Sequence, residues 1–225
     1  IAGGVLTLPQ DVLRQALLHE LQLTGVGVEW NTSLAVVEQD AGSVWGRLLR
    51  EDPAGRVLGS RGEVSAFEAD FVIGADGYDS TVRGALGIQL LDHGALQSFA
   101  FFDAATQRAG NEAQLAIADD YCNSVYPLQG GQSRFSFQLG GSLNKALEPG
   151  ALRELLLARM PWYGEEIVSC DWSGVAEFRR ALVERFGKGR VWLAGEAAHL
   201  TGPLGVQSLN VGLDEASELA LRIGD

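Results

Sequence analysis

The chain has 225 residues, of which 46% are hydrophobic and 20% are charged, so it is long enough to bury a core as one large domain or two smaller ones. Its formal net charge of -12 argues against a nucleic-acid partner, because binding to DNA or RNA depends mainly on lysine and arginine side chains that neutralise phosphates. We find no apolar run long enough to span a bilayer and expect no membrane partner. Cys122 and Cys170 lie far apart and outside metal-ligand spacing, which predicts reduced thiols, no metal site and a cytoplasmic protein.

The first predicted elements are a short strand at residues 5–8 and a helix that Gly25 ends. The apolar face of this helix comprises Leu13, Ala16, Leu17 and Leu21. Gln10 and Arg14, four residues apart, share a different face. The chain opens without methionine in what resembles the middle of a strand, so we expect it to be a fragment.

Alternating, valine-rich segments follow this helix. Strands are expected at residues 26–30, 34–37, 44–49 and 64–67, joined by polar turns into an antiparallel meander. Residues 71–73 form a continuous apolar run, which is typical of a strand buried on both faces.

The remaining sequence predicts a second, sheet-rich unit, followed by a buried strand and a helix like those of the first part of the chain. Residues from about 90 to 173 carry aromatic side chains on strand-like segments, with one helix near residues 150–160. A buried strand is expected at residues 191–194, followed by a last helix at 206–223. The apolar residues of that helix have the spacing of one face: Leu209, Leu213, Ala216, Ala220 and Ile223.

The first junction that could carry chemistry is "VIGADGYDSTVR". Asp76 can accept hydrogen bonds from neighbouring amides, and Gly77 permits a tight turn. Ser80 can cap the following helix. Two interpretations stay open: a structural turn in which Arg83 pairs with an aspartate, or a site in which Arg83 faces an anionic cofactor.

The second junction is "WLAGEAAHLTGPLGVQSLN". Small residues such as Gly195 allow a bulky ligand to lie against the backbone, and Glu196 can accept hydrogen bonds from ligand hydroxyls at the carboxyl end of a strand. Pro203 and Gly205 shape a loop before an uncharged first helical turn, whose free N–H groups favour something negative. That turn consists of Val206, Gln207, Ser208, Leu209 and Asn210. His199 is interpreted as structural, and no catalytic residue is assigned.

Together, the motifs "GADGYDSTVR" and "GEAAHLTGPLGVQSLNVG" resemble those of the FAD-dependent aromatic hydroxylases, the single-component flavoprotein monooxygenases of the p-hydroxybenzoate hydroxylase type. "LPQDVLRQAL" is more weakly similar to the segment of that family that approaches the flavin, which gives Gln10 and Arg14 a cofactor-binding interpretation.

The resemblance implies an α/β (α+β) fold: a Rossmann-like FAD-binding domain at residues 1–89 and 176–225, with an inserted antiparallel-sheet substrate domain at 90–175. It implies that Glu196 binds the ribityl hydroxyls and that the loop from Pro203 to Asn210 passes beside the isoalloxazine ring. Asp76, Gly77 and Arg83 would organise the other turn near the cofactor and the approach of NAD(P)H. The implied reaction is hydroxylation or epoxidation of an aromatic or polyketide-like small molecule by a flavin C4a-hydroperoxide.

The sequence departs from the family pattern at three points. Glu196 replaces aspartate, Ser208 replaces glycine, and no G-x-G-x-x-G turn for the FAD pyrophosphate is present. We expect that turn to be cut off, disordered or supplied as a separate chain, and this fragment alone to be inactive. The alternatives are a flavin-dependent halogenase, a prenyl-chain reductase, or a non-catalytic truncated flavoprotein.

Overall fold

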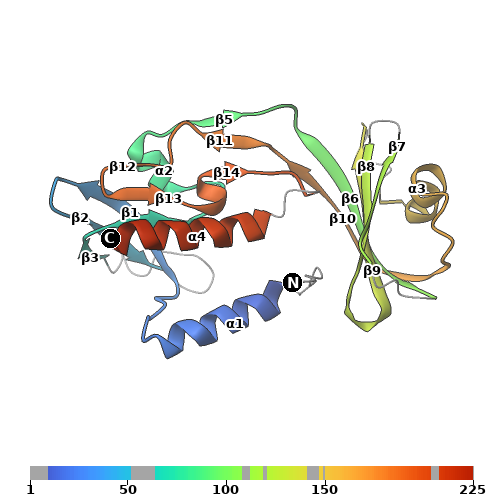
Figure 1. Cartoon of the computed structure of the whole chain (residues 1–225), viewed down its shortest axis with the longest axis horizontal. Helices are drawn as coiled ribbons and strands as arrows, with labels where there is room; N and C mark the ends of the chain where they lie inside the picture. Colours follow the sequence, from blue (N-terminus) through green and yellow to red (C-terminus); the bar gives the residue numbers. More distant parts are fainter. Residues whose placement is uncertain are drawn as a thin grey trace. The chain divides into compact units, whose positions relative to one another are not determined.

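The computed structural model describes residues 10–51, 64–107, 112–118, 121–140, 147–148, 150–203 and 208–224 (Figure 1). The four α-helices of these residues are α1 (Gln10–Leu23), α2 (Thr81–Leu86), α3 (Ala151–Arg159) and α4 (Ser208–Gly224). The first strands are β1 (Thr32–Gln39), β2 (Val44–Arg50), β3 (Val64–Ala69), β4 (Val72–Gly74) and β5 (Leu90–Asp92). The middle strands are β6 (Gln97–Thr106), β7 (Gln114–Ala118), β8 (Tyr121–Pro127), β9 (Gln132–Leu139) and β10 (Ile167–Phe178). The last strands are β11 (Ala181–Val183), β12 (Gly187–Lys188), β13 (Val191–Leu193) and β14 (His199–Leu200). The strand predicted at residues 5–8 lies outside the described residues.

The chain divides into two compact units, and the first joins residues 1–33 to 49–64. Its helix α1 ends as predicted, because Gly25 adopts the left-handed φ of 77° and the Val26 N–H donates to the Leu21 carbonyl. The strand predicted at residues 26–30 is wrong. These residues have no strand assignment, and Asn31 takes a left-handed φ of 56° in the turn just before β1 begins.

The second unit joins residues 34–48 to 65–225 and contains every sheet in full or in large part. One three-stranded sheet has the order β1-β2-β3, as the predicted meander requires. The turn between β1 and β2 is held by Asp40, whose carboxylate accepts the N–H groups of Gly42 and Ser43 at 2.7 and 3.0 Å. Those two bonds lower the pKa of Asp40, since they stabilise its charged form.

The sheet that positions the two junctions has the order β12-β13-β4. Strands β13 and β4 are parallel, with Val191 opposite Val72 and Leu193 opposite Gly74, so both strands end at the same edge. A core covers one face of this pair and includes Val44, Val82, Ile88, Val183, Val191 and Leu193.

The prediction that the strand at residues 71–73 is buried on both faces is wrong for the described residues. Ile73 in β4 is 47% exposed, and its neighbour Trp192 in β13 is 36% exposed. Successive side chains of a strand point to opposite faces, and the described core covers only the face that carries Val191 and Leu193.

The predicted second sheet-rich region is a five-stranded antiparallel sheet with the order β10-β6-β9-β8-β7. The predicted helix is α3, which packs on one face of this sheet, as Figure 1 shows. The shared core includes Phe102, Phe135, Phe137, Leu152, Leu156 and Met160. A small sheet of order β14-β11-β5 completes the strand pairing of the described residues.

The last predicted helix is present as α4, but its apolar residues do not form a buried face. Leu209 and Leu213 are 48% and 43% exposed, and the described part of α4 has no buried residue. The half-buried positions of the described helix are Gly212, Glu215, Leu219 and Ile223, and of these only Ile223 belongs to the predicted face. Among the described residues, no helix is long and apolar enough to cross a membrane.

Candidate functional site

The two junctions singled out in the sequence lie side by side at one edge of the parallel strand pair. Gly74 ends β4 opposite Leu193, the last residue of β13. The N–H of Ala194 then donates to the Gly74 carbonyl at 3.0 Å, which extends the pairing one step beyond the strands. This carboxyl edge is where ligands bind in open parallel sheets.

The first junction folds onto the start of α2. The Asp76 carboxylate accepts the Val82 N–H at 3.1 Å, and the Ser80 hydroxyl caps the helix by accepting the Arg83 N–H at 2.9 Å. Gly77 has a φ of 78°, which favours glycine. Gly74 is required for a different reason, because a Cβ at this position would lie 2.6 Å from the Cβ of Val82.

Arg83 joins the two junctions. One guanidinium nitrogen, Nη1, donates to the Ala197 carbonyl at 3.1 Å, and Nη2 donates to the Tyr78 carbonyl at 2.6 Å. The alternative in which Arg83 pairs with an aspartate of its own turn is wrong for the described residues, since neither Asp76 nor Asp79 forms an ion pair with it. Arg83 therefore connects backbone groups that are far apart in the sequence.

The second junction is a short 3-10 turn, η3 (Gly195–Ala197), that begins at a φ of 58° on Gly195. Ala197 and Ala198 are fully buried in the core beneath it. The Glu196 side chain is exposed, and its carboxylate accepts no hydrogen bond within the part of the chain that the structure describes. The turn thus offers space beside Gly195 and, at Glu196, an exposed carboxylate that can accept hydrogen bonds from a ligand.

A residue that the sequence did not single out holds this turn. The Glu215 Oε2 atom, on α4, accepts the Gly195 N–H at 3.1 Å and lies 2.8 Å from His199 Nε2. His199, interpreted from the sequence as structural, thus has a carboxylate partner. No local pattern distinguishes Glu215 from its acidic neighbours Asp214 and Glu218, because its role depends on how α4 packs.

The other predicted site residues are only partly placed. Gln10 and Arg14 are exposed on α1, which belongs to the first unit, whereas the junctions belong to the second. Pro203 is half-buried, and no acidic side chain lies in the first turn of α4, which begins at Ser208 and includes Leu209 and Asn210. Gly205, Val206 and Gln207 lie outside the described residues.

Near the first junction, Arg179 approaches the Tyr78 hydroxyl through Nη1 at 3.3 Å. Its Nη2 atom donates to the Asp92 carboxylate at 2.7 Å, and a second nitrogen, Nε, pairs with the other carboxylate oxygen. Hydrogen bonding to Arg179 lowers the pKa of Asp92. Arg179 and Asp92 thus form an exposed ion pair next to the first junction.

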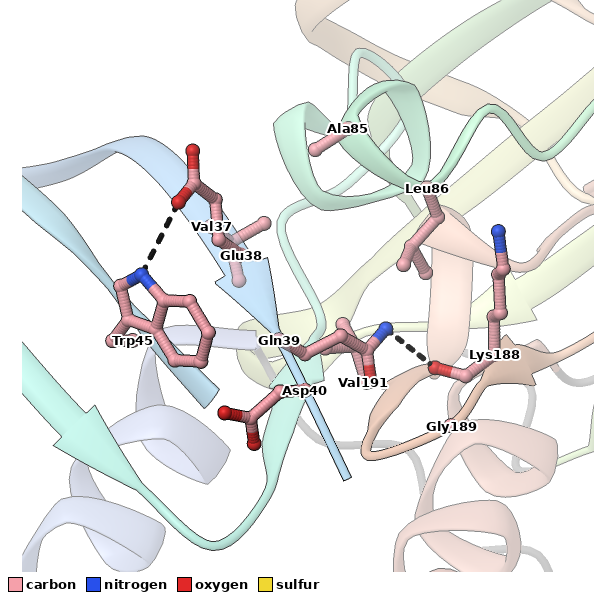
Figure 2. A pocket seen from close by; sticks show the side chains of 10 residues that line it. All are labelled: Val37, Glu38, Gln39, Asp40, Trp45, Ala85, Leu86, Lys188, Gly189 and Val191. Carbon is pink, nitrogen blue, oxygen red and sulfur yellow. Dashed lines mark hydrogen bonds between the residues drawn. The ribbon is translucent and has the colours of Figure 1, made fainter. Parts of the chain in front are cut away.

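A cavity of about 570 Å³ lies elsewhere, as Figure 2 shows. Its lining includes Lys188, Gly189 and Val191, at the amino end of β13, whereas Glu196 follows the carboxyl end. The Gln39 amide donates to the Lys188 carbonyl at 2.8 Å across this cavity. A second cavity, of about 410 Å³, is lined by His199 and Glu215 among others and adjoins the second junction.

Comparisons with known proteins identify the family of the chain. A family model described as "FAD binding domain" matches residues 3–224. The chain is 26% identical over 226 residues to the 6-methylpretetramide 4-monooxygenase of Streptomyces rimosus, covering 98% of this chain and 38% of the relative. It is 28% identical over 231 residues to the pentachlorophenol 4-monooxygenase of Sphingobium chlorophenolicum, covering 95% of this chain and 39% of the relative.

Among solved structures, an aklavinone-11 hydroxylase in complex with FAD and aklavinone aligns with a TM-score of 0.70 and 25% identity. That alignment covers 96% of this chain and 41% of the other, and it supports the mixed α and β fold predicted from the sequence. The chain spans about two fifths of the length of the two curated relatives. It belongs to the FAD-binding domain family of the FAD-dependent aromatic hydroxylases.

Proposed function

We propose that the whole protein is a flavoprotein monooxygenase that uses NAD(P)H and O2 to hydroxylate or epoxidise an aromatic or polyketide-like small molecule. The single observation that carries this proposal is the exposed, unpaired Glu196 carboxylate at the carboxyl edge of the parallel strand pair. The relatives named for 6-methylpretetramide and pentachlorophenol support the substrate class.

The residues of this edge fit FAD. A ribityl chain presents several hydroxyl donors, and a carboxylate that no protein group occupies is a suitable acceptor for them. No atom of the described residues is recorded within 4 Å of where a Cβ of Gly195 would stand, so a ligand can approach the backbone of the turn. We therefore assign Glu196 and Gly195 to cofactor binding.

The start of α4 has the electrostatic character that a reduced flavin requires. Its first turn carries no acidic side chain, so the positive end of the helix dipole favours an anion there. We propose that Ser208, Leu209 and Asn210, with Pro203, lie beside the flavin ring. The same proposal extends to Gly205, Val206 and Gln207, which lie outside the described residues.

When bound, FAD supplies the redox chemistry, taking electrons from NAD(P)H and passing them to O2. The protein's part is to bind, orient and exclude water. Asp76 and Gly77 shape the first turn, and Arg83 links it to the second, with one guanidinium nitrogen donating to a carbonyl of each. Their role in our proposal is to keep the cofactor edge in one shape and to border the path of NAD(P)H.

We propose that the FAD-binding domain comprises residues 1–89 and 176–225 and that residues 90–175 form the substrate domain. The five-stranded sheet supports this division, since its core with α3 contains no residue of the core beneath the two junctions. From the sequence resemblance alone, we also propose that Gln10 and Arg14 bind the cofactor.

The test uses the whole protein. We expect the purified protein to be yellow, with flavin absorption, and to consume NAD(P)H and O2 faster when an aromatic substrate is added. A halogenase would instead give a product whose mass depends on added chloride or bromide. A colourless protein that does not respond to added FAD would refute the proposal.

A further inference from the structure

We propose that Glu215 is a positioning residue of the FAD site, which fixes the turn that presents Glu196 to the cofactor. This inference rests on the proposed role of Glu196. It concerns a carboxylate that is engaged within the protein, since its Oε2 atom accepts the Gly195 N–H at 3.1 Å.

The geometry of Gly195 makes this bond consequential. The φ of Gly195, 58°, is in the left-handed region. Because φ is the rotation about the N–Cα bond of Gly195, it sets the direction in which the chain continues to Glu196. A hydrogen bond to the Gly195 N–H fixes the peptide plane on one side of that rotation. Within the turn, the Ala198 N–H also donates to the Gly195 carbonyl at 2.9 Å, and Arg83 donates to the Ala197 carbonyl at 3.1 Å, but neither bond holds the Gly195 N–H.

His199 contacts the same carboxylate oxygen of Glu215. Its Nε2 atom lies 2.8 Å from the same carboxylate oxygen, and its side chain is only 11% exposed. His199 belongs to β14, which pairs with β11 through His199 and Leu182. The carboxylate is thus fixed between a helix and a sheet, and it can hold the Gly195 turn rigidly.

Two carboxylates therefore flank Gly195 with different tasks. Glu215 is occupied by protein donors, whereas Glu196 makes no hydrogen bond within the described residues and remains available to a ligand. If Glu215 acts by orienting Glu196, removing the Glu215 carboxylate lowers the affinity for FAD only while Glu196 is present. If Glu215 has a purely structural role, its removal lowers the affinity for FAD equally whether or not Glu196 is present.

A double-mutant cycle on FAD affinity separates these roles. The variants are Glu215→Ala, Glu196→Ala and the double substitution, measured in the whole protein by titration with FAD and flavin fluorescence. We expect Glu215→Ala to weaken FAD binding about 10-fold, as for the loss of a charged hydrogen bond, and to have less than a threefold effect in the Glu196→Ala background. Glu215→Gln keeps an acceptor oxygen for Gly195, and we expect it to recover most of the affinity.

The matched control is Glu218→Ala, on the same helix, which removes an exposed carboxylate paired with Arg222 and should leave FAD affinity unchanged. Equal effects of Glu215→Ala in both backgrounds, or no effect in either, overturn the positioning role. If Glu196→Ala itself leaves the affinity unchanged, the proposed function of Glu196 fails instead. Should Glu215→Ala not fold, Glu215→Asp takes its place in the cycle with the same expected pattern.

Discussion

Arg83 offers the sharpest test of the idea that the two junctions form one site. Its guanidinium donates to a carbonyl of each junction, Ala197 at 3.1 Å and Tyr78 at 2.6 Å. Arg83→Met keeps a similar apolar stem but removes both donors. Arg83→Lys retains the charge, yet a single ammonium does not reproduce the planar fork that reaches two acceptors.

The expected loss follows from those two bonds. A hydrogen bond that involves a charged group contributes about 1.5–3 kcal/mol when it is well shielded. The Arg83 side chain is only half-buried, so solvent competes for both carbonyls and each of the two bonds contributes about 1 kcal/mol, below that range. We expect Arg83→Met to reduce the free energy of unfolding by about 2 kcal/mol, and Arg83→Lys by about half as much.

Urea unfolding of the whole protein, followed by tryptophan fluorescence, measures this difference as a shift of the midpoint at constant slope. Arg222→Met is the control, since Arg222 is exposed and pairs only with Glu218 one helical turn away among the described residues. We expect that variant to remain within about 0.5 kcal/mol of the wild type. An Arg83→Met protein that is as stable as the control would show that the link between the junctions has no energetic importance.

Three further predictions concern the same region. Gly74→Ala would place a Cβ 2.6 Å from that of Val82 and should cost about 1–3 kcal/mol of unfolding free energy, part of which Val82→Ala restores in the double variant. The added Cβ of Gly195→Ala has no described atom within 4 Å, but the alanine must hold a φ of 58°, so we expect the free energy of unfolding to fall by about 1–2 kcal/mol. A decrease smaller than the error of urea titration would contradict the left-handed conformation of Gly195. Arg179 lowers the pKa of Asp92, so the stabilisation that Asp92 provides is present above the unfolded pKa of about 3.9 and is lost as pH falls through the lower folded value. The thermal midpoints of the wild type and Asp92→Asn should therefore converge below about pH 4, and a difference that grows there would refute the pairing.

The sequence predicted those parts of the site that depend on local chain chemistry. The glycines and the aspartate of the first junction, and the small residues around Glu196, mark turns that follow strands, and the structure has a turn at each place. The apolar runs at residues 71–73 and 191–194 correspond to β4 and β13. Their parallel pairing brings the junctions together at one edge.

The parts that were missed depend on packing between distant segments. Apolar spacing placed Leu209 and Leu213 on one face of α4, but the described structure leaves that face exposed and turns Glu215 inward. A carboxylate that accepts a hydrogen bond from a backbone N–H in another element produces no recognisable pattern in the sequence of its own helix. The strand expected at residues 26–30 failed because valine content indicates a strand only where a partner strand is present.

Titration of the whole protein with FAD, comparing the wild type with Glu196→Ala, tests the central claim most directly. In our proposal the Glu196 carboxylate accepts hydrogen bonds from the ribityl hydroxyls of bound FAD, so its loss should weaken binding by about 1–3 kcal/mol, which corresponds to about 5- to 150-fold in the dissociation constant. Equal affinity of the two proteins for FAD would contradict the assignment of Glu196, and with it the proposal that this edge of the sheet holds the flavin.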